Sequence, residues 1–149
     1  MRILEIEKLF QDETTLGQIM EECKEDIELV DYYANQILKS TVANNPEEAK
    51  KALLVVTGVY SNLTTVLSIA ESEKKNRQER EYNRLRIEIE NAGSKFVSAQ
   101  ADKQSSAFVG DYRRIRNLIE GYVKAAEKQI SSLQSVLKYE STKYNAEPK

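Results

Sequence analysis

Residues 107–139, AFVGDYRRIRNLIEGYVKAAEKQISSLQSVLKY, contain a long apolar seam on which the fold of this 149-residue chain depends. Apolar side chains recur there in steps of three and four, which places them along one side of a single long helix. A helix of this length cannot bury such a seam alone, so other parts of the chain, or a second chain, must cover it. The predicted packing or oligomer seam comprises Phe108, Tyr112, Ile115, Ile119, Tyr122, Leu133 and Leu137, with Ala126 and the polar Gln129 in the same phase.

Two further helices are predicted on the N-terminal side. Residues 2–10 indicate a short amphipathic helix. Thr15 followed by Gln18 resembles a capping box, which would begin a second helix that continues to Ile37. Its outer face is acidic. Its apolar positions are Leu16, Met20, Cys23, Ile27, Val30, Ala34 and Ile37.

The sequence NNPEE at residues 44–48 marks the clearest boundary. Asn45 can cap a helix whose first residue is Pro46. A heptad seam then runs from Ala49 to Ala70, and eleven residues without an apolar side chain follow. We expect the helix to continue through this charged run, leaving the bundle and projecting into solvent, until Gly93 ends it. The alternative is that the run is an ordinary solvated helix face or a loop.

Residues 98–107, SAQADKQSSA, allow two interpretations, a polar loop or a thin helix of small residues. Asp111 is expected to cap the following helix, which ends near Tyr139 or Tyr144. The patterns together predict an all-α protein in which a few long amphipathic helices form an elongated antiparallel hairpin or bundle with coiled-coil character. The predicted single domain divides into acidic helices (1–44), a long helix with a charged extension (45–93), a C-terminal long helix (94–144) and a tail (145–149).

The composition argues against catalysis. There is no His, and the one cysteine, Cys23, cannot form a disulfide within the chain or a zinc site alone. Phosphate loops, dinucleotide turns and nucleophile elbows are absent from the sequence. A metal site at Glu21, Glu25 and Glu28 is conceivable, but helical metal sites normally use inward-facing glutamates, so we favour a solvated acidic face. We therefore expect no enzyme activity, no cofactor and no metal.

The sequence also indicates a compartment. The N-terminus lacks a signal-peptide pattern, and no apolar run approaches the roughly 18 residues that a membrane span needs. We expect a soluble cytoplasmic protein that does not enter the membrane.

Arginine provides the one positive functional signal, because seven of the eight arginines lie between residues 77 and 116. The planar fork of arginine matches two phosphate oxygens, and Tyr82 and Tyr112 lie among these cations, where aromatic rings could stack on bases. The candidate nucleic-acid-binding residues are Arg77, Arg80, Arg84, Arg86, Arg113, Arg114 and Arg116, with Lys74 and Lys75 beside them.

Two other interpretations of this segment remain open. In the first, both tyrosines belong to packing seams and the arginines pair along the helix with nearby acids, namely Glu79, Glu81, Glu88 and Glu90. In the second, the acidic first half of one copy meets the arginine segment of another, which would give a head-to-tail or ring assembly. Residues 1–73 hold fourteen acidic and six basic side chains, whereas residues 74–116 hold six acidic and eleven basic ones.

The tract at residues 98–139 combines a small-residue AD-x-x-x-S run, an arginine-rich turn and a helix containing LIEGY and ISSLQSVLK. In plan it is similar to the UvsY-type recombination mediators of tailed phages. The resemblance implies a small helical protein that oligomerises, binds single-stranded DNA and helps to load a recombinase. It would place DNA contact at the seven candidate arginines and assembly on the seam of the last helix.

We therefore predict a non-enzymatic, oligomeric accessory protein of phage DNA recombination or replication, acting in the host cytosol. Its expected partners are further copies of itself, single-stranded DNA and a recombinase or replication protein. The alternative is a protein-only interaction module with an acidic partner: a phage inhibitor, a counter-defence factor, or a virion or scaffolding component. A third hypothesis is an oligomer that sequesters a small nucleotide at Arg113, Arg114 and Arg116.

Overall fold

The structure is a computed structural model that describes residues 3–146, and within that range it is helical, without a strand. The predicted all-α class is therefore confirmed. The first residue of the predicted helix 2–10 and the last three of the predicted tail lie outside the described range. The elements are α1 (Ile3–Phe10), the 3-10 turn η1 (Glu13–Thr15), α2 (Leu16–Glu22), α3 (Lys24–Leu38), α4 (Pro46–Asn91), α5 (Ser98–Phe108) and α6 (Gly110–Ala146).

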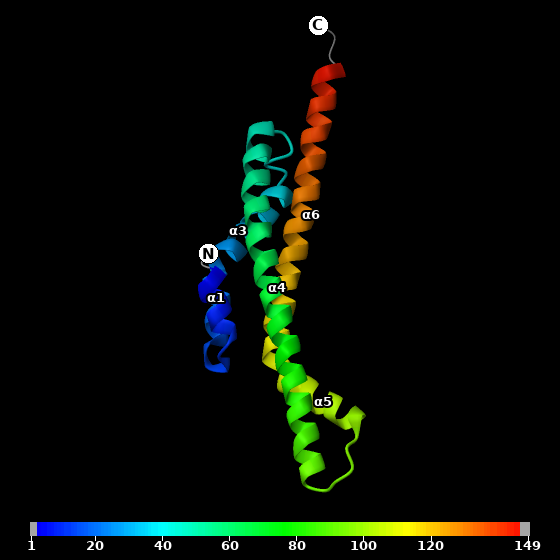
Figure 1. Cartoon of the computed structure of the whole chain (residues 1–149). Coiled ribbons are helices and arrows are strands. Elements are labelled where there is room, and N and C mark those ends of the chain that lie inside the picture. The colour runs from blue at the N-terminus through cyan, green and yellow to red at the C-terminus, as the bar shows by residue number, and fades with distance from the viewer. Residues whose placement is uncertain (1–2, 147–149) are drawn as a thin grey trace.

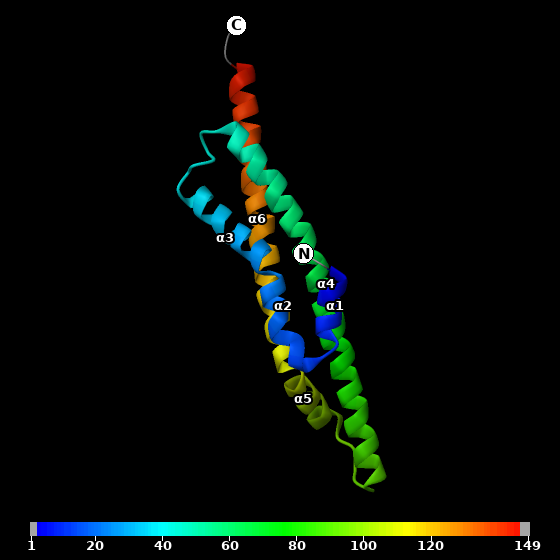
Figure 2. The same ribbon diagram turned by 90° about the vertical axis from the view of Figure 1, so that its left-hand side faces the viewer.

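Helices α4 and α6 form an elongated antiparallel hairpin that sets the shape of the molecule (Figure 1). Helices α1, α2 and α3 lie along one side of this hairpin, and α5 lies beside the lower end of α4 (Figure 2). The predicted antiparallel helical hairpin is confirmed. The N-terminal helices thus form a third layer over only part of its length.

Both ends of α4 follow the predicted signals. The Asn45 Oδ1 accepts a hydrogen bond from the Glu48 N–H at 3.3 Å, and Pro46 occupies the first helical turn. At the other end Gly93 has a φ of +71°, and the Ser94 N–H donates to the Ile89 carbonyl at 3.1 Å. This is a Schellman ending, which favours glycine because the left-handed conformation strains other residues.

The core lies mainly between α4 and α6. On α4 the buried positions also recur in steps of three and four: Ala49, Ala52, Val56, Val59, Leu63, Val66 and Ala70. The heptad phase predicts Leu53, Tyr60 and Leu67 where Ala52, Val59 and Val66 are buried, and those three larger side chains are half-buried at the border. On α6 they are Tyr112, Ile115, Ile119, Val123, Ala126, Gln129 and Leu133. Of the predicted seam, Tyr112, Ile115, Ile119 and Leu133 are buried, whereas Tyr122 and Leu137 are half-buried at its border.

Phe108 does not belong to this seam. It is the last residue of α5, its side chain is 50% exposed, and the neighbouring Val109 is fully buried instead. The chain changes direction between α5 and α6 at Val109, so the two residues face different ways. The prediction that Phe108 packs in the seam of α6 is wrong for this reason.

The predicted helix over residues 15–37 is interrupted. Cys23 separates α2 from α3 and its N–H donates to the Ile19 carbonyl at 3.1 Å. The change of direction lets α2 lie on α6 while α3 lies across both α4 and α6 (Figure 2). It also shifts the buried face, so that Tyr33 is buried and Ala34 is exposed. The Thr15 hydroxyl makes no cap hydrogen bond; it donates to the Leu9 carbonyl at 2.8 Å.

The charged run after Ala70 stays helical, as predicted, but it does not leave the bundle there. Arg77 continues the packing face of α4 and lies over the ring of Tyr112. Farther along, α5 packs on α4 through the buried Ala101 and Ser105, which confirms the thin-helix interpretation of this segment. Asp111 lies within the first turn of α6 rather than at its cap.

Helix α4 has the predicted extent, but it is more apolar than the sequence analysis assumed. Over an 18-residue window its mean hydropathy is 1.6, so by length and composition alone it could cross a membrane. The prediction that no apolar run approaches the length of a membrane span is therefore wrong. The reason is that residues 52–70 contain no charge, and their serines and threonines lower the hydropathy only modestly. One face of the same segment forms the core with α6.

Candidate nucleic-acid interface

Two of the candidate arginines are paired only with acids on their own helix. Arg84 holds both carboxylate oxygens of Glu81, with Nε–Oε2 at 3.0 Å and Nη2–Oε1 at 2.8 Å, and it also binds Glu88 at 2.5 Å. Arg86 binds Glu90 at 3.2 Å. The hydrogen bonds from Arg84 lower the pKa of Glu81. These are the pairs that the salt-bridge interpretation predicts, and they neutralise much of the charge in this part of α4.

Arg113 and Arg116 connect different elements. The Arg113 Nη2 donates to the carbonyl of Ser106 at 2.9 Å and to its hydroxyl at 2.6 Å, so it caps the last turn of α5. The Arg116 Nε donates to Glu71 of α4 at 3.1 Å, and its Nη1 donates to Glu120 at 2.6 Å. The hydrogen bond to Glu71 raises the pKa of Arg116. Both arginines therefore stabilise the fold.

Arg77 fastens the N-terminal helix to the hairpin. Its Nη2 donates to the carbonyls of Phe10, at 3.3 Å, and Gln11, at the end of α1. Its Cζ lies 4.7 Å from the centre of the Tyr112 ring, a cation–π contact. Glu73 adds an ion pair at 3.9 Å. One side chain thus joins α1, α4 and α6.

Arg80 and Arg114 are different, because both are exposed and neither makes a hydrogen bond or ion pair within residues 3–146. Arg80 lines a shallow hollow of about 210 Å³ on α4 and α5. We call this hollow the arginine notch. Its lining residues are Arg77, Arg80, Glu81, Arg84 and Phe108.

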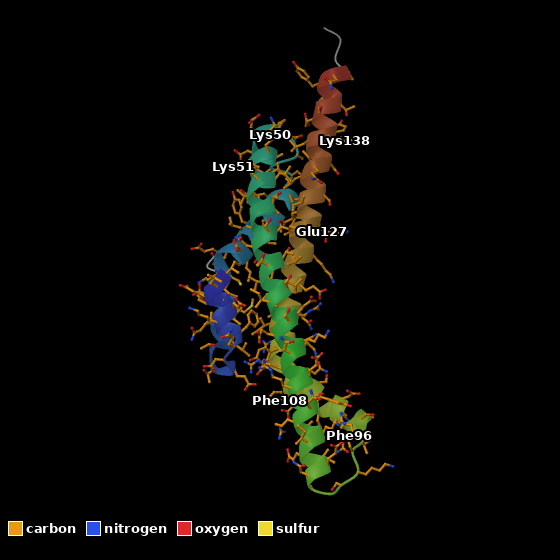
Figure 3. All side chains as sticks on the ribbon, in the orientation of Figure 1. Lys50, Lys51, Phe96, Phe108, Glu127 and Lys138 are labelled. Atoms are coloured by element: carbon orange, nitrogen blue, oxygen red, sulfur yellow. The ribbon has the colours of Figure 1, made fainter. Side chains whose placement is uncertain are left out.

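Phe108 is the exposed aromatic side chain of the arginine notch. Figure 3 shows it where the end of α5 meets α4, on the opposite side of α4 from Phe96 in that view. The chain therefore brings a half-exposed aromatic ring beside the Arg80 guanidinium, which pairs with no acid in the described range 3–146. Arg84 lies in the same notch, although Glu81 and Glu88 already bind it.

Neither tyrosine singled out from the sequence lines the arginine notch. Tyr112 is 1% exposed and belongs to the core, as the seam interpretation predicts. Tyr82 is half-buried, and its ring meets that of Phe96 edge to face with centroids 5.6 Å apart. It lines a polar hollow of about 450 Å³ between α4 and α5, together with Lys75. The sequence analysis assigned Phe108 to the packing seam and so missed it as an exposed aromatic residue. Val109 beside it fits the same apolar spacing, and the spacing alone does not show which of the two is buried.

Arg114 lies on a separate surface. It borders a groove of about 320 Å³ between α2 and α6, whose floor includes Met20 and Leu118. The groove is bordered by the acids Glu13 and Asp111 as well. Arg114 and the arginine notch are therefore distinct candidate sites. The structure does not bring the seven arginines together as one basic face.

The acidic face of α2 and α3 shows no metal site. Among the residues that the structure describes, 3–146, no group of three or more His, Cys, Asp and Glu side chains could hold a metal ion. Glu21, Glu25 and Glu28 are exposed, and Glu21 pairs with Lys24 at 3.5 Å. This region is a solvated acidic surface.

Comparison with protein-family models, with curated proteins and with solved structures finds no match to this chain. The resemblance to UvsY-type mediators stays a prediction from the sequence. Any functional proposal therefore depends on the geometry of the arginine notch and on the charge pattern.

Proposed function

We propose that this protein is a non-catalytic helical accessory protein that contacts single-stranded nucleic acid through the arginine notch. The observation that carries the proposal is the unpaired guanidinium of Arg80 beside the half-exposed ring of Phe108. An aromatic ring can stack on an unpaired base, and a neighbouring arginine can bind its phosphate. The sequence resemblance supports the same role and suggests phage DNA recombination or replication as its setting.

Stacking also explains why the ligand would be a single strand. A base within a duplex is already stacked on its neighbours, whereas an unpaired base exposes its face to a protein ring. A contact of this kind contributes about 1–3 kcal/mol per base and tolerates every sequence. Arg80 would add a salt-dependent contact through the release of counterions.

The test is fluorescence anisotropy over a salt series with a labelled oligo(dT) of about 30 nucleotides. This length exceeds the binding site of one small domain. Phe108→Ala and Arg80→Gln are expected to weaken binding by at least about 5-fold, in line with the loss of one stacking or phosphate contact. Arg80→Gln is also expected to reduce the slope of log K against log salt by about 0.7. A duplex of the same length should bind more weakly.

Arg86→Gln is the matched control, because Arg86 is exposed on the same helix but is paired with Glu90 outside the notch. It should leave affinity within about 2-fold of the wild type, since it removes one charge and no notch contact. Absence of binding at 50 mM salt, or an equal loss in Arg86→Gln and Arg80→Gln, would contradict the proposal.

A second candidate is a protein-only interaction module, which the internal pairing of Arg84, Arg86, Arg113 and Arg116 favours. The groove beside Arg114 would accept an apolar side chain against Met20 and Leu118, and Arg114 would bind a neighbouring carboxylate. The partner in this second candidate could also be another copy of the chain. The second candidate is favoured if oligo(dT) does not bind but Leu118→Asp changes the mass measured by light scattering.

A further inference from the structure

Arg77 belongs both to the arginine notch and to the attachment of the N-terminal hook. We define the N-terminal hook as residues 3–15, which comprise α1 and η1. Ile6 and Phe10 of the hook are fully buried against the hairpin. The Thr15 hydroxyl donates to the Leu9 carbonyl and closes the hook on itself.

The hook is ordered by its tertiary contacts. Helix α1 has only eight residues, and an isolated helix of that length is unstable in water. Its last carbonyls, of Phe10 and Gln11, accept hydrogen bonds from the Arg77 guanidinium, which also complements the negative end of the helix dipole. Docking of the hook and the position of Arg77 therefore depend on each other.

Arg77 keeps donors for another ligand while it holds the hook. A guanidinium has five N–H groups, and the carbonyls of the hook engage Nη2 alone. The Arg77 Nε is buried 3.9 Å from Glu73 and is closed to a ligand, whereas Nη1 makes no hydrogen bond within residues 3–146 and keeps its donors. The same side chain lines the notch beside Arg80.

We propose that the N-terminal hook positions Arg77 for the arginine notch, so that hook docking and strand binding stabilise each other. This inference rests on the proposed function and concerns the regulation of the same site. Coupling of this kind is reciprocal: if the docked hook raises affinity for the strand, the bound strand stabilises the hook by the same factor. The opposite coupling would arise if a phosphate drew Arg77 away from the carbonyls of Phe10 and Gln11.

The first measurement is hydrogen exchange of the full chain with and without saturating 30-nucleotide oligo(dT). Amides of the hook are expected to exchange at least about 5-fold more slowly with the strand bound, the lower end of usual coupling energies. The segment around Leu133 provides an internal reference, because it lies at the other end of the hairpin and should not change. Faster or unchanged exchange in the hook would overturn the inference.

The second measurement is oligo(dT) affinity after the hook is loosened. Phe10→Ala is expected to weaken binding at least about 5-fold although Phe10 does not line the notch. Leu133→Ala is the matched truncation of a buried side chain far from the notch, and it should leave affinity within about 2-fold. Thr15→Ala is a milder second variant that removes only the hydroxyl contacts of the hook. Circular dichroism verifies that each variant is folded.

A double-mutant cycle separates positioning from a general loss of stability. In an Arg77→Gln background, Phe10→Ala should have no further effect on affinity, because the side chain that transmits the coupling is absent. An undiminished effect would overturn the inference. If the wild type binds oligo(dT) but the hook does not respond, the inference fails and the proposed function stands. If the wild type does not bind, both fail.

Discussion

Two arginine side chains join elements that lie far apart in the sequence. Arg77 reaches the end of α1, and Arg116 pairs with Glu71 on the facing helix. Both side chains are about one-fifth exposed, so their charges are less screened than those of Arg84 and Arg86. The arginines of this chain therefore divide into structural and surface groups, which sequence proximity does not reveal.

The buried thiol of Cys23 is expected to make the free energy of unfolding decrease at alkaline pH. Burial, followed by the charges of Asp26 and Glu22, raises its pKa to about 11. The pKa in the unfolded chain is about 8.5, so the folded state keeps the proton longer. The resulting stability is complete below about pH 8.5 and is lost as the pH rises towards 11.

Urea unfolding at pH 8 and pH 10.5 tests this contribution. The wild type is expected to lose roughly 2 kcal/mol more than Cys23→Ala over this interval, since the variant has no thiol to ionise. Burial also raises the pKa values of Tyr33 and Tyr112, but both proteins share those tyrosines, and the difference isolates Cys23. Equal losses in the two proteins would show that the thiol does not contribute.

At the level of the element, Gly58 inside α4 and Gly93 just after its C-terminal end have opposite roles. Gly93 has a positive φ of +71° and ends the helix, whereas Gly58 lies in the exposed helix interior with no positive φ. A Cβ at either position would meet no heavy atom within 4 Å. Backbone conformation, rather than space, therefore determines the effect of a substitution.

Gly93→Ala is expected to lower the free energy of unfolding by about 1–2 kcal/mol, because alanine is strained in the left-handed region. Gly58→Ala is expected to raise it by about 0.5–1 kcal/mol, because alanine favours a helix interior. Chemical denaturation of the two variants in parallel measures both changes. Effects of the same sign would contradict the assignment of Gly93 as the helix terminator.

The whole molecule is an elongated hairpin with a third layer on part of one side. Helix α4 has 46 residues and spans about 69 Å at 1.5 Å per residue. Helix α6 runs beside it and extends past its N-terminal end (Figure 1). A chain of this length folded as a compact globule would have a radius of gyration of about 15 Å.

Small-angle X-ray scattering at low concentration is expected to give a radius of gyration above about 20 Å, the value for a thin rod as long as α4. Light scattering on the same samples tests self-association by comparing the mass with the 17.0 kDa of one chain. A radius near 15 Å at the mass of one chain would mean that the hairpin folds back on itself in solution.

The helices were predictable because their signals are local. Asn45, Pro46 and Gly93 act through the backbone within one or two turns, and the three–four spacing of apolar residues depends only on the geometry of the helix. The sequence therefore determined the all-α class, the extent of α4 and most of the buried face of α6. It also indicated the ion pairs of Arg84 and Arg86, whose partners lie three or four residues away.

The contents of the arginine notch were decided by the tertiary structure. Phe108 and Val109 are adjacent apolar residues, and only the packing of α5 against α4 selects which of them is buried. Likewise Arg77 has acids beside it on its own helix, but its hydrogen bonds go to carbonyls that lie 66 and 67 residues away. Which residue is buried and which carbonyl Arg77 binds depend on the relative placement of α1, α4, α5 and α6. This placement results from many weak contacts over the whole hairpin, and no single stretch of sequence encodes their sum.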